Sequence, residues 1–245
     1  MKKLRALFAI SLGLIPFGLV QAHEEPPAEA GPTSPWSGKV GVGYLATAGN
    51  SDNTALNANF DLAYDKDKWH HLLNAVALGT VADDVTTAER YQLGYKAQYD
   101  FSEFNYVFGL LGWEKDRFSG VAEQTTQAVG YGRRIINNER HVLNAEVGVG
   151  AKQLDFADGT EESGTVLRGA MDYAWAISDT ANFTQTLALE NGADNTYIES
   201  VSSLGATIVG NIGLSISYTV KHNTDAPVGF DETDTYTAVN LDYVF

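Results

Sequence analysis

A histidine and a threonine near the end of the chain are spaced so that they could support nucleophilic chemistry. His222 precedes Thr224 by two residues, so both side chains lie on one face of an extended chain. A histidine that contacts a hydroxyl can activate it as a nucleophile. Thr224, however, falls where a loop is expected to begin, and the sequence names no third partner. The pair is therefore kept only as an alternative, hydrolytic interpretation.

Two adjacent carboxylates, Asp83 and Asp84, are a second candidate for acid–base chemistry. Outer-membrane proteases use opposed carboxylates and a histidine across the mouth of a barrel. Adjacent residues of an extended chain point in opposite directions, which argues against these two carboxylates acting as such a pair. A solvated acidic loop is the better interpretation.

Acidic residues also gather in several segments that separate apolar stretches. We call these acidic segments together the acidic rim. Hard cations such as calcium and magnesium bind clustered oxygens, so divalent cations are possible partners of the acidic rim. No segment has the spacing of an EF-hand, and a solvated anionic surface is the alternative. The acidic residues concerned are Asp83, Asp84, Asp155, Asp158, Glu161, Glu162, Asp194, Asp225, Asp231, Glu232 and Asp234.

The elements that must position these residues are strands. Apolar and polar residues alternate with a period of two along most of the chain, as in "LNANFDLAY" (56–64) and "LNAEVGVGAK" (143–152), and no stretch keeps a helical period. About twelve strands are predicted, with apolar residues on both faces of the third, ninth and tenth. Their predicted ranges are 38–47, 53–65, 68–80, 88–101, 104–116, 122–136, 140–154, 163–177, 181–191, 195–209, 211–223 and 233–245.

Connections that alternate between short and generally longer, acidic segments predict an all-β, antiparallel up-and-down barrel. A soluble barrel would show the same alternation with its apolar face inside. Aromatic residues near strand ends, an even strand number and unlike loops at the two ends favour a transmembrane barrel with its apolar face toward lipid and both termini in the periplasm. The aromatic residues assigned to the lipid face are Tyr44, Tyr64, Trp69, Tyr91, Phe101, Tyr106, Tyr131, Trp175, Tyr218, Tyr243 and Phe245. His70, His71 and His141 fall near the periplasmic ends of strands, where an aromatic-belt or headgroup role is expected.

The opposite phase of the alternation predicts a charged lumen. Two interpretations stay open: the charges pair across the lumen as a structural network, or they line a narrow, wet pore that selects small solutes. The predicted lumen charges are Asp61, Lys96, Asp100, Glu146, Lys152, Arg168, Asp172, Lys221 and Asp242.

The last strand, "TYTAVNLDYVF" (235–245), has Leu241, Tyr243 and Phe245 on its lipid face and ends in an aromatic residue. A barrel has no exposed edges, so this strand must pair with the first strand, near 38–47. The terminal pattern also resembles the carboxyl-terminal signature by which outer-membrane barrels are handed to their assembly machinery.

Three parts of the chain are expected. Residues 1–22 combine a basic start, an apolar run and a small-residue cleavage site, as in a secretory signal peptide. Residues 23–37 form a Pro/Glu-rich linker, and 38–245 form the barrel. Without the signal peptide, the chain has 13 basic and 31 acidic residues, which gives a net charge of −18. This negative charge argues against nucleic acid as a partner. The chain has no cysteine, so no disulfide stabilises it.

Six segments in order carry a resemblance to a known family. They are "TAGNSDNTALNANF" (47–60), "RYQLGYKAQYDFSEFNYVFG" (90–109), "DRFSG" (116–120), "GYGRR" (130–134), "DNTYIES" (194–200) and "YTVKHNTDAPVGFDETDTYTAVNLDYVF" (218–245). Together they resemble the YdiY-like salt-induced outer-membrane proteins of Gram-negative bacteria. The resemblance implies an outer-membrane β-barrel without an assigned activity, and it supplies no catalytic residue.

We therefore expect a non-enzymatic, porin-like barrel of the cell outer membrane, either a narrow passive pore or an envelope-stabilising protein linked to salt or osmotic stress. The alternative is an outer-membrane hydrolase, phospholipase- or protease-like, with a site near the extracellular rim. An adhesin or receptor would need longer loops. Outer-membrane lipid, lipopolysaccharide and the barrel assembly machinery are the expected partners. No catalytic residue, cofactor or bound metal is predicted.

Overall fold

The computed structural model describes residues 34–47, 53–82, 85–117, 121–193, 195–225 and 232–245. These residues form twelve strands: β1 (Trp36–Thr47), β2 (Asn53–Lys66), β3 (Trp69–Ala82), β4 (Val85–Asp100), β5 (Asn105–Asp116), β6 (Val121–Asn137), β7 (His141–Phe156), β8 (Glu161–Ser178), β9 (Ala181–Asn191), β10 (Thr196–Val209), β11 (Ile212–Asn223) and β12 (Thr233–Val244). The described residues contain no helix long and apolar enough to cross a membrane.

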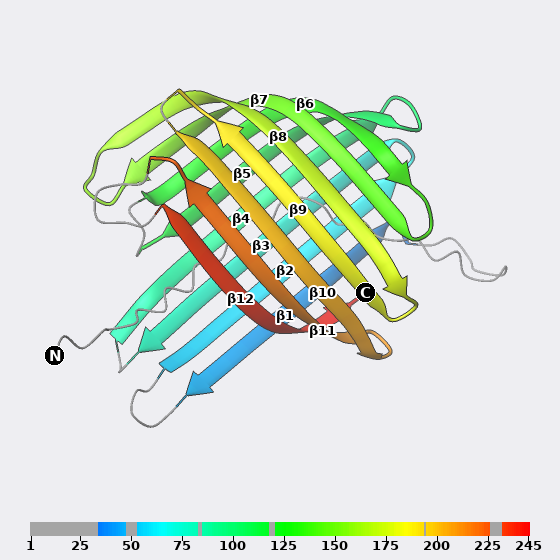
Figure 1. Cartoon of the computed structure of the whole chain (residues 1–245), viewed down its shortest axis with the longest axis horizontal. Coiled ribbons are helices and arrows are strands. Elements are labelled where there is room, and N and C mark those ends of the chain that lie inside the picture. The colour runs from blue at the N-terminus through cyan, green and yellow to red at the C-terminus, as the bar shows by residue number, and fades with distance from the viewer. Residues whose placement is uncertain (1–33, 48–52, 83–84, 118–120, 194, 226–231) are drawn as a thin grey trace.

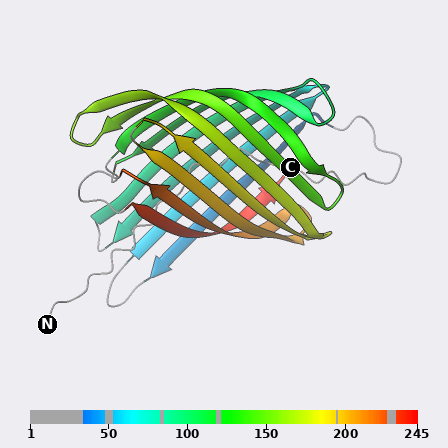
Figure 2. The same cartoon turned by 45° about the horizontal axis from the view of Figure 1, so that its top comes forward.

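Every strand pairs antiparallel with its neighbour in sequence, and β1 pairs with β12 to close the barrel. The strands run diagonally around the wall, with β6 to β9 on one side and β1 and β12 meeting on the other (Figures 1 and 2). The predicted all-β, up-and-down barrel of twelve strands is thus confirmed. Its boundaries agree with the predicted ranges to within three residues.

The closing seam is short and uses the last residues of the chain. Lys39 to Val42 lie opposite Val244 to Leu241, and Gly38 and Phe245 exchange two main-chain hydrogen bonds of 2.8 and 2.9 Å. The Phe245 ring lies over Gly38, so closely that a Cβ on Gly38 would collide with it. Leu241 and Tyr243 point to the exposed outer face, as the alternation predicts.

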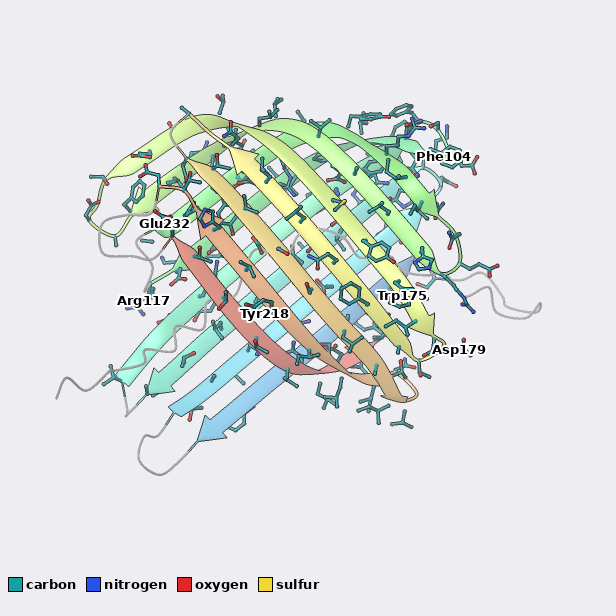
Figure 3. The ribbon with its side chains drawn as sticks, in the orientation of Figure 1. Phe104, Arg117, Trp175, Asp179, Tyr218 and Glu232 are labelled. Carbon is teal, nitrogen blue, oxygen red and sulfur yellow. The ribbon has the colours of Figure 1, made fainter. Side chains whose placement is uncertain are left out.

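The two ends of the barrel differ. We call "turn end" the end that holds the β2–β3, β4–β5, β6–β7, β8–β9 and β10–β11 turns, the start of β1 and the end of β12; the opposite end is the "loop end". Figure 3 shows Phe104, Trp175 and Asp179 at the turn end, and Arg117 and Glu232 at the loop end. The connection between the predicted strands 68–80 and 88–101 is shorter than expected, because β3 continues to Ala82 and β4 begins at Val85. The β-branched residues of this segment favour continued strand pairing.

Burial alternates along the strands as the inverted pattern of a membrane barrel requires. Val129, Val147, Val149 and Leu241 are more than half exposed on the outside, whereas charged residues are buried inside. Of the aromatic residues assigned to the lipid face, Tyr106 is a wrong prediction. It is 2% exposed and its hydroxyl donates to Glu146 Oε1 inside the barrel (2.8 Å). Nearness to a strand end suggests an aromatic-belt position for Tyr106, but Tyr106 shares the inward phase of Phe108 and Leu110 on β5.

Candidate functional site

The loop half of the lumen is crossed by an ion pair between opposite walls. β5 and β11 stand six strands apart in the ring of twelve, yet Lys221 Nζ lies 3.7 Å from Glu114 Oε1. Glu114 also accepts from Arg90 and, at 2.9 Å each, from Gln92 and Gln124. The carboxylate is buried, but its partners satisfy it, which such burial requires. These contacts constrict the lumen at this level.

Tyr197 of β10 extends the constriction along the wall. Two lysine ammonium groups lie near its ring, with Lys152 Nζ 4.8 Å and Lys221 Nζ 6.0 Å from the ring centroid. Its hydroxyl donates to Glu199 Oε2 at 2.7 Å, and Glu199 is 1% exposed.

Glu190 of β9 completes this network. It accepts hydrogen bonds from Lys152 and Arg168, each at 3.1 Å. Residues of β4 to β11 therefore meet inside the loop half of the barrel. We call this set the lumen network: Arg90, Glu114, Gln124, Lys152, Arg168, Glu190, Tyr197, Glu199 and Lys221.

A second cluster fills the lumen beside β5. Lys96 pairs with Glu146, which also accepts from Tyr106, and the Lys96 ammonium lies 5.0 Å from the centroid of the Phe108 ring. Tyr106, Phe108, Leu110 and Ala128 form an apolar core against Leu72. This wall of the barrel is therefore packed rather than open.

A third cluster lies inside the turn end. His70 contacts Asp65 (2.7 Å) and Asp100 (3.1 Å), and Arg134 donates to Asp100 at 2.6 Å. The belt role expected for His70 is therefore wrong, because its side chain points inward into an ionic cluster. His71 and His141 instead contact the hydroxyls of Tyr95 and Tyr173 and stack on aromatic rings, as a belt position requires.

A cavity of about 560 Å³ occupies the lumen between β1–β3 and β9–β12. Amide and hydroxyl side chains make up nearly half of its lining residues, beside glycines, apolar residues and three charged residues, and it reaches from Gly210 and Phe245 at the turn end to Thr219. Lys221, the next inward residue after Thr219, belongs to the lumen network. The cavity thus ends where the lumen network begins.

The predicted lumen charges all lie on the inward phase of their strands. Asp61, Lys96, Glu146, Arg168, Asp172, Lys221 and Asp242 are buried, and Asp100 and Lys152 are partly buried. Asp61 lies 4.0 Å from Lys39, and Asp172 Oδ1 has no hydrogen-bond partner among the described residues. Asp61 and Asp242 line the cavity, away from the lumen network that contains Lys152, Arg168 and Lys221.

The residues of the alternative hydrolytic site do not come together. His222 contacts Thr233 Oγ1 at 2.9 Å, whereas the Thr224 hydroxyl donates to Asn195 at 3.2 Å. Asp83 and Asp84 lie outside the described residues.

The acidic rim is described only in part, because Asp83, Asp84, Asp194 and Asp231 lie outside the described residues. Hydrogen bonds from the Thr160 side chain and main chain lower the pKa of the Asp158 carboxyl, which is therefore engaged within its own turn. Among the described residues, no group of three or more His, Cys, Asp or Glu side chains is placed to hold a metal.

Several residues of the lumen network were not predicted. Arg90 and Glu114 share the inward phase of Gln92 and Asp116, so alternation could have found them. Tyr197 and Glu199 lie on β10, where apolar residues on both faces obscured the phase. No sequence signal indicated that Lys221 and Glu114, more than a hundred residues apart, would meet.

A closed, even-numbered, antiparallel barrel with an apolar outside and a charged inside is the fold of porin-like outer-membrane β-barrels. The chain belongs to the family described as "Protein of unknown function, DUF481", whose model matches residues 40–245. The uncharacterized protein YdiY of Escherichia coli (strain K12) is 30% identical over 210 residues, which are 85% of this chain and 83% of that protein. The expected YdiY-like relationship is thereby confirmed.

Solved structures share the fold at low identity. The translocator domain of the autotransporter NalP from Neisseria meningitidis has a TM-score of 0.50 and 11% identity, over 86% of this chain and 88% of that one. The KdgM porin in complex with disordered oligogalacturonate has a TM-score of 0.48 and 10% identity, over 84% and 99% of the two chains. The NanC porin has a TM-score of 0.47 and 12% identity, over 84% of this chain and 97% of that one. At these identities the likeness concerns the fold alone.

Proposed function

We propose that the protein is a narrow passive channel of the outer membrane for small polar solutes and ions. The observation that carries this proposal is the cavity of about 560 Å³, which extends to the turn end and whose lining includes amide and hydroxyl groups. These groups offer water molecules hydrogen-bond partners along the cavity wall. The proposed orientation places the turn end in the periplasm, as in bacterial barrels.

The lumen network sets the width of the proposed channel. Lys221 and Glu114 contact each other across the lumen, and Tyr197 lies beside them. Barrels with sixteen or more strands leave wide aqueous channels, whereas small barrels are filled by side chains. Twelve strands with a crossed lumen therefore favour passage of small solutes only. A link to salt or osmotic stress is proposed from the family resemblance alone.

Conductance of the purified protein in a planar lipid bilayer tests the proposal. We expect small, discrete openings from the wild-type protein and larger openings from Tyr197→Ala, because that change removes a ring from the constriction. Tyr218→Ala is the matched control: this tyrosine lies on the outer face of β11 (Figure 3), and its removal leaves conductance unchanged.

The channel proposal would be rejected if neither the wild-type protein nor Tyr197→Ala showed conductance steps. Heat-modifiable mobility must show that both proteins are correctly folded. The protein would then be the envelope-stabilising barrel, which the ion pair across the lumen favours. Equal conductance of Tyr197→Ala and the wild-type protein would place the constriction elsewhere.

A further inference from the structure

Oxygen atoms of four side chains converge on the inner surface of the closing seam, above two glycines of β1. Asn59 of β2 and Asp242 of β12 are both paired with Gly41, and a Cβ on Gly41 would collide with the Oδ1 atoms of both. Gly43 lies two residues further along β1 on the same inner face. A Cβ on Gly43 would lie 2.6 Å from Asn57 Oδ1 and 2.7 Å from Asn240 Oδ1. The absence of a Cβ on the two glycines thus lets these four oxygen atoms lie close to the β1 main chain and to one another. The strands concerned lie side by side at the closure (Figure 1).

This oxygen cluster contains a carboxylate without a partner. Asp242 is 7% exposed, and its Oδ1 has no hydrogen-bond partner among the described residues; the same holds for Asn240 Oδ1. The neighbouring carboxylate, Asp61, has Lys39 at 4.0 Å. A buried carboxylate is costly unless a positive charge or hydrogen-bond donors compensate it. The cluster therefore has one negative charge to neutralise and two acceptor oxygens, Asn240 Oδ1 and Asp242 Oδ1, without a donor among the described residues.

We propose that this cluster, formed by Asn57, Asn59, Asn240 and Asp242, binds a monovalent metal cation that enters from the cavity. Carboxylate and amide oxygens suit hard cations, and rings of carbonyl oxygens can replace the hydration shell of an alkali metal ion. A single uncompensated carboxylate matches a single positive charge. Asn57, Asn59, Asn240 and Asp242 all line the cavity, so an ion can reach them from the turn end. The site does not depend on conduction through the lumen network.

Thermal unfolding of the protein in detergent micelles tests the site, because a ligand that binds only the folded state raises the unfolding midpoint. The midpoint is measured in NaCl, KCl, CaCl2 and N-methylglucamine chloride at equal ionic strength, by heat-modifiable mobility. We expect a higher midpoint in NaCl or KCl than in N-methylglucamine chloride for the wild-type protein. Asp242→Asn should abolish this difference.

Asp172→Asn is the matched control, since it also removes one buried carboxylate with an unpartnered Oδ1 but lies outside the cluster. It should keep the cation-dependent difference. Should Asp242→Asn fail to fold, Gly41→Ala places a Cβ against the Asn59 and Asp242 oxygen atoms and displaces them. Broadening of the ²³Na resonance by wild-type protein, lost in Gly41→Ala, then reports binding directly.

Three results would overturn the proposal. One is no cation-dependent difference in the wild-type protein, as expected if the Asn59 amide turned and donated to Asp242. Another is an equal difference in the wild-type protein and Asp242→Asn, which would indicate binding elsewhere. The last is a response to calcium only, at the same ionic strength. None of these measurements uses conductance, so their outcome is distinct from that of the channel experiment.

Discussion

At the scale of single residues, the lumen is organised by carboxylates that each serve several partners. Glu114 joins Arg90, Gln92, Gln124 and Lys221, which come from three different strands, β4, β6 and β11. Removal of this buried carboxylate would take away the hydrogen-bonded counter-charge of Arg90, which keeps the longer contact to Asp116 at 3.9 Å, and the carboxylate that pairs with Lys221. The free energy of folding should therefore depend strongly on this residue.

We expect Glu114→Ala to lower the free energy of unfolding by about 3 kcal/mol, the loss typical of breaking a buried ion pair. Glu123→Ala is the control, because the Glu123–Lys115 pair (3.8 Å) is roughly 40% exposed and should contribute at most about 1 kcal/mol. Urea unfolding of the refolded barrel in micelles measures both. Equal losses for the two variants would contradict a central role of Glu114.

At the scale of elements, closure depends on the last residues of the chain. β12 supplies Leu241 to Val244 to the seam, and the hydrogen bonds between Gly38 and Phe245 extend it. Without these residues, part of the β1 edge would expose main-chain donors and acceptors to lipid, which offers no hydrogen bonds. The seam is therefore required for insertion and not only for stability.

Deletion of 240–245 should abolish assembly, and the protein should lose its heat-modifiable mobility on a gel. Phe245→Tyr retains both the ring over Gly38 and the main-chain hydrogen bonds, so it should assemble normally. A truncated protein that still inserts with normal mobility would contradict the closure argument.

At the scale of the whole molecule, charge is unevenly distributed between the outside and the inside. The wall exposes apolar side chains, and the chain beyond residue 22 has a net charge of −18. Its acidic residues therefore concentrate in the lumen and in the segments between strands. Clefts with one sign of charge raise the local concentration of the opposite ion.

If the barrel conducts, its reversal potential in a KCl gradient should show a preference for cations. The preference should weaken as ionic strength rises, because salt screens the acidic residues at the loop end over a Debye length of about 10 Å at 0.1 M. Reversal potentials of the wild-type protein at low and high salt measure this. A preference for anions would contradict it.

The sequence by itself determined the strands, their number and the phase of nine charges, since a period of two depends only on local backbone geometry. The aromatic residues near strand ends and the unlike connections indicated which phase faces inward. The sequence did not indicate which way Tyr197 faces, because the strand of Tyr197 has apolar residues on both faces. It also suggested a lipid-facing Tyr106, because this residue lies near a strand end, whereas Tyr106 is buried in the lumen. Only the tertiary structure decided that Lys221 meets Glu114 across the lumen, and that Asn59 and Asp242 converge over Gly41. These contacts depend on closure and on the register between strands far apart in sequence, which alternation along one strand does not contain.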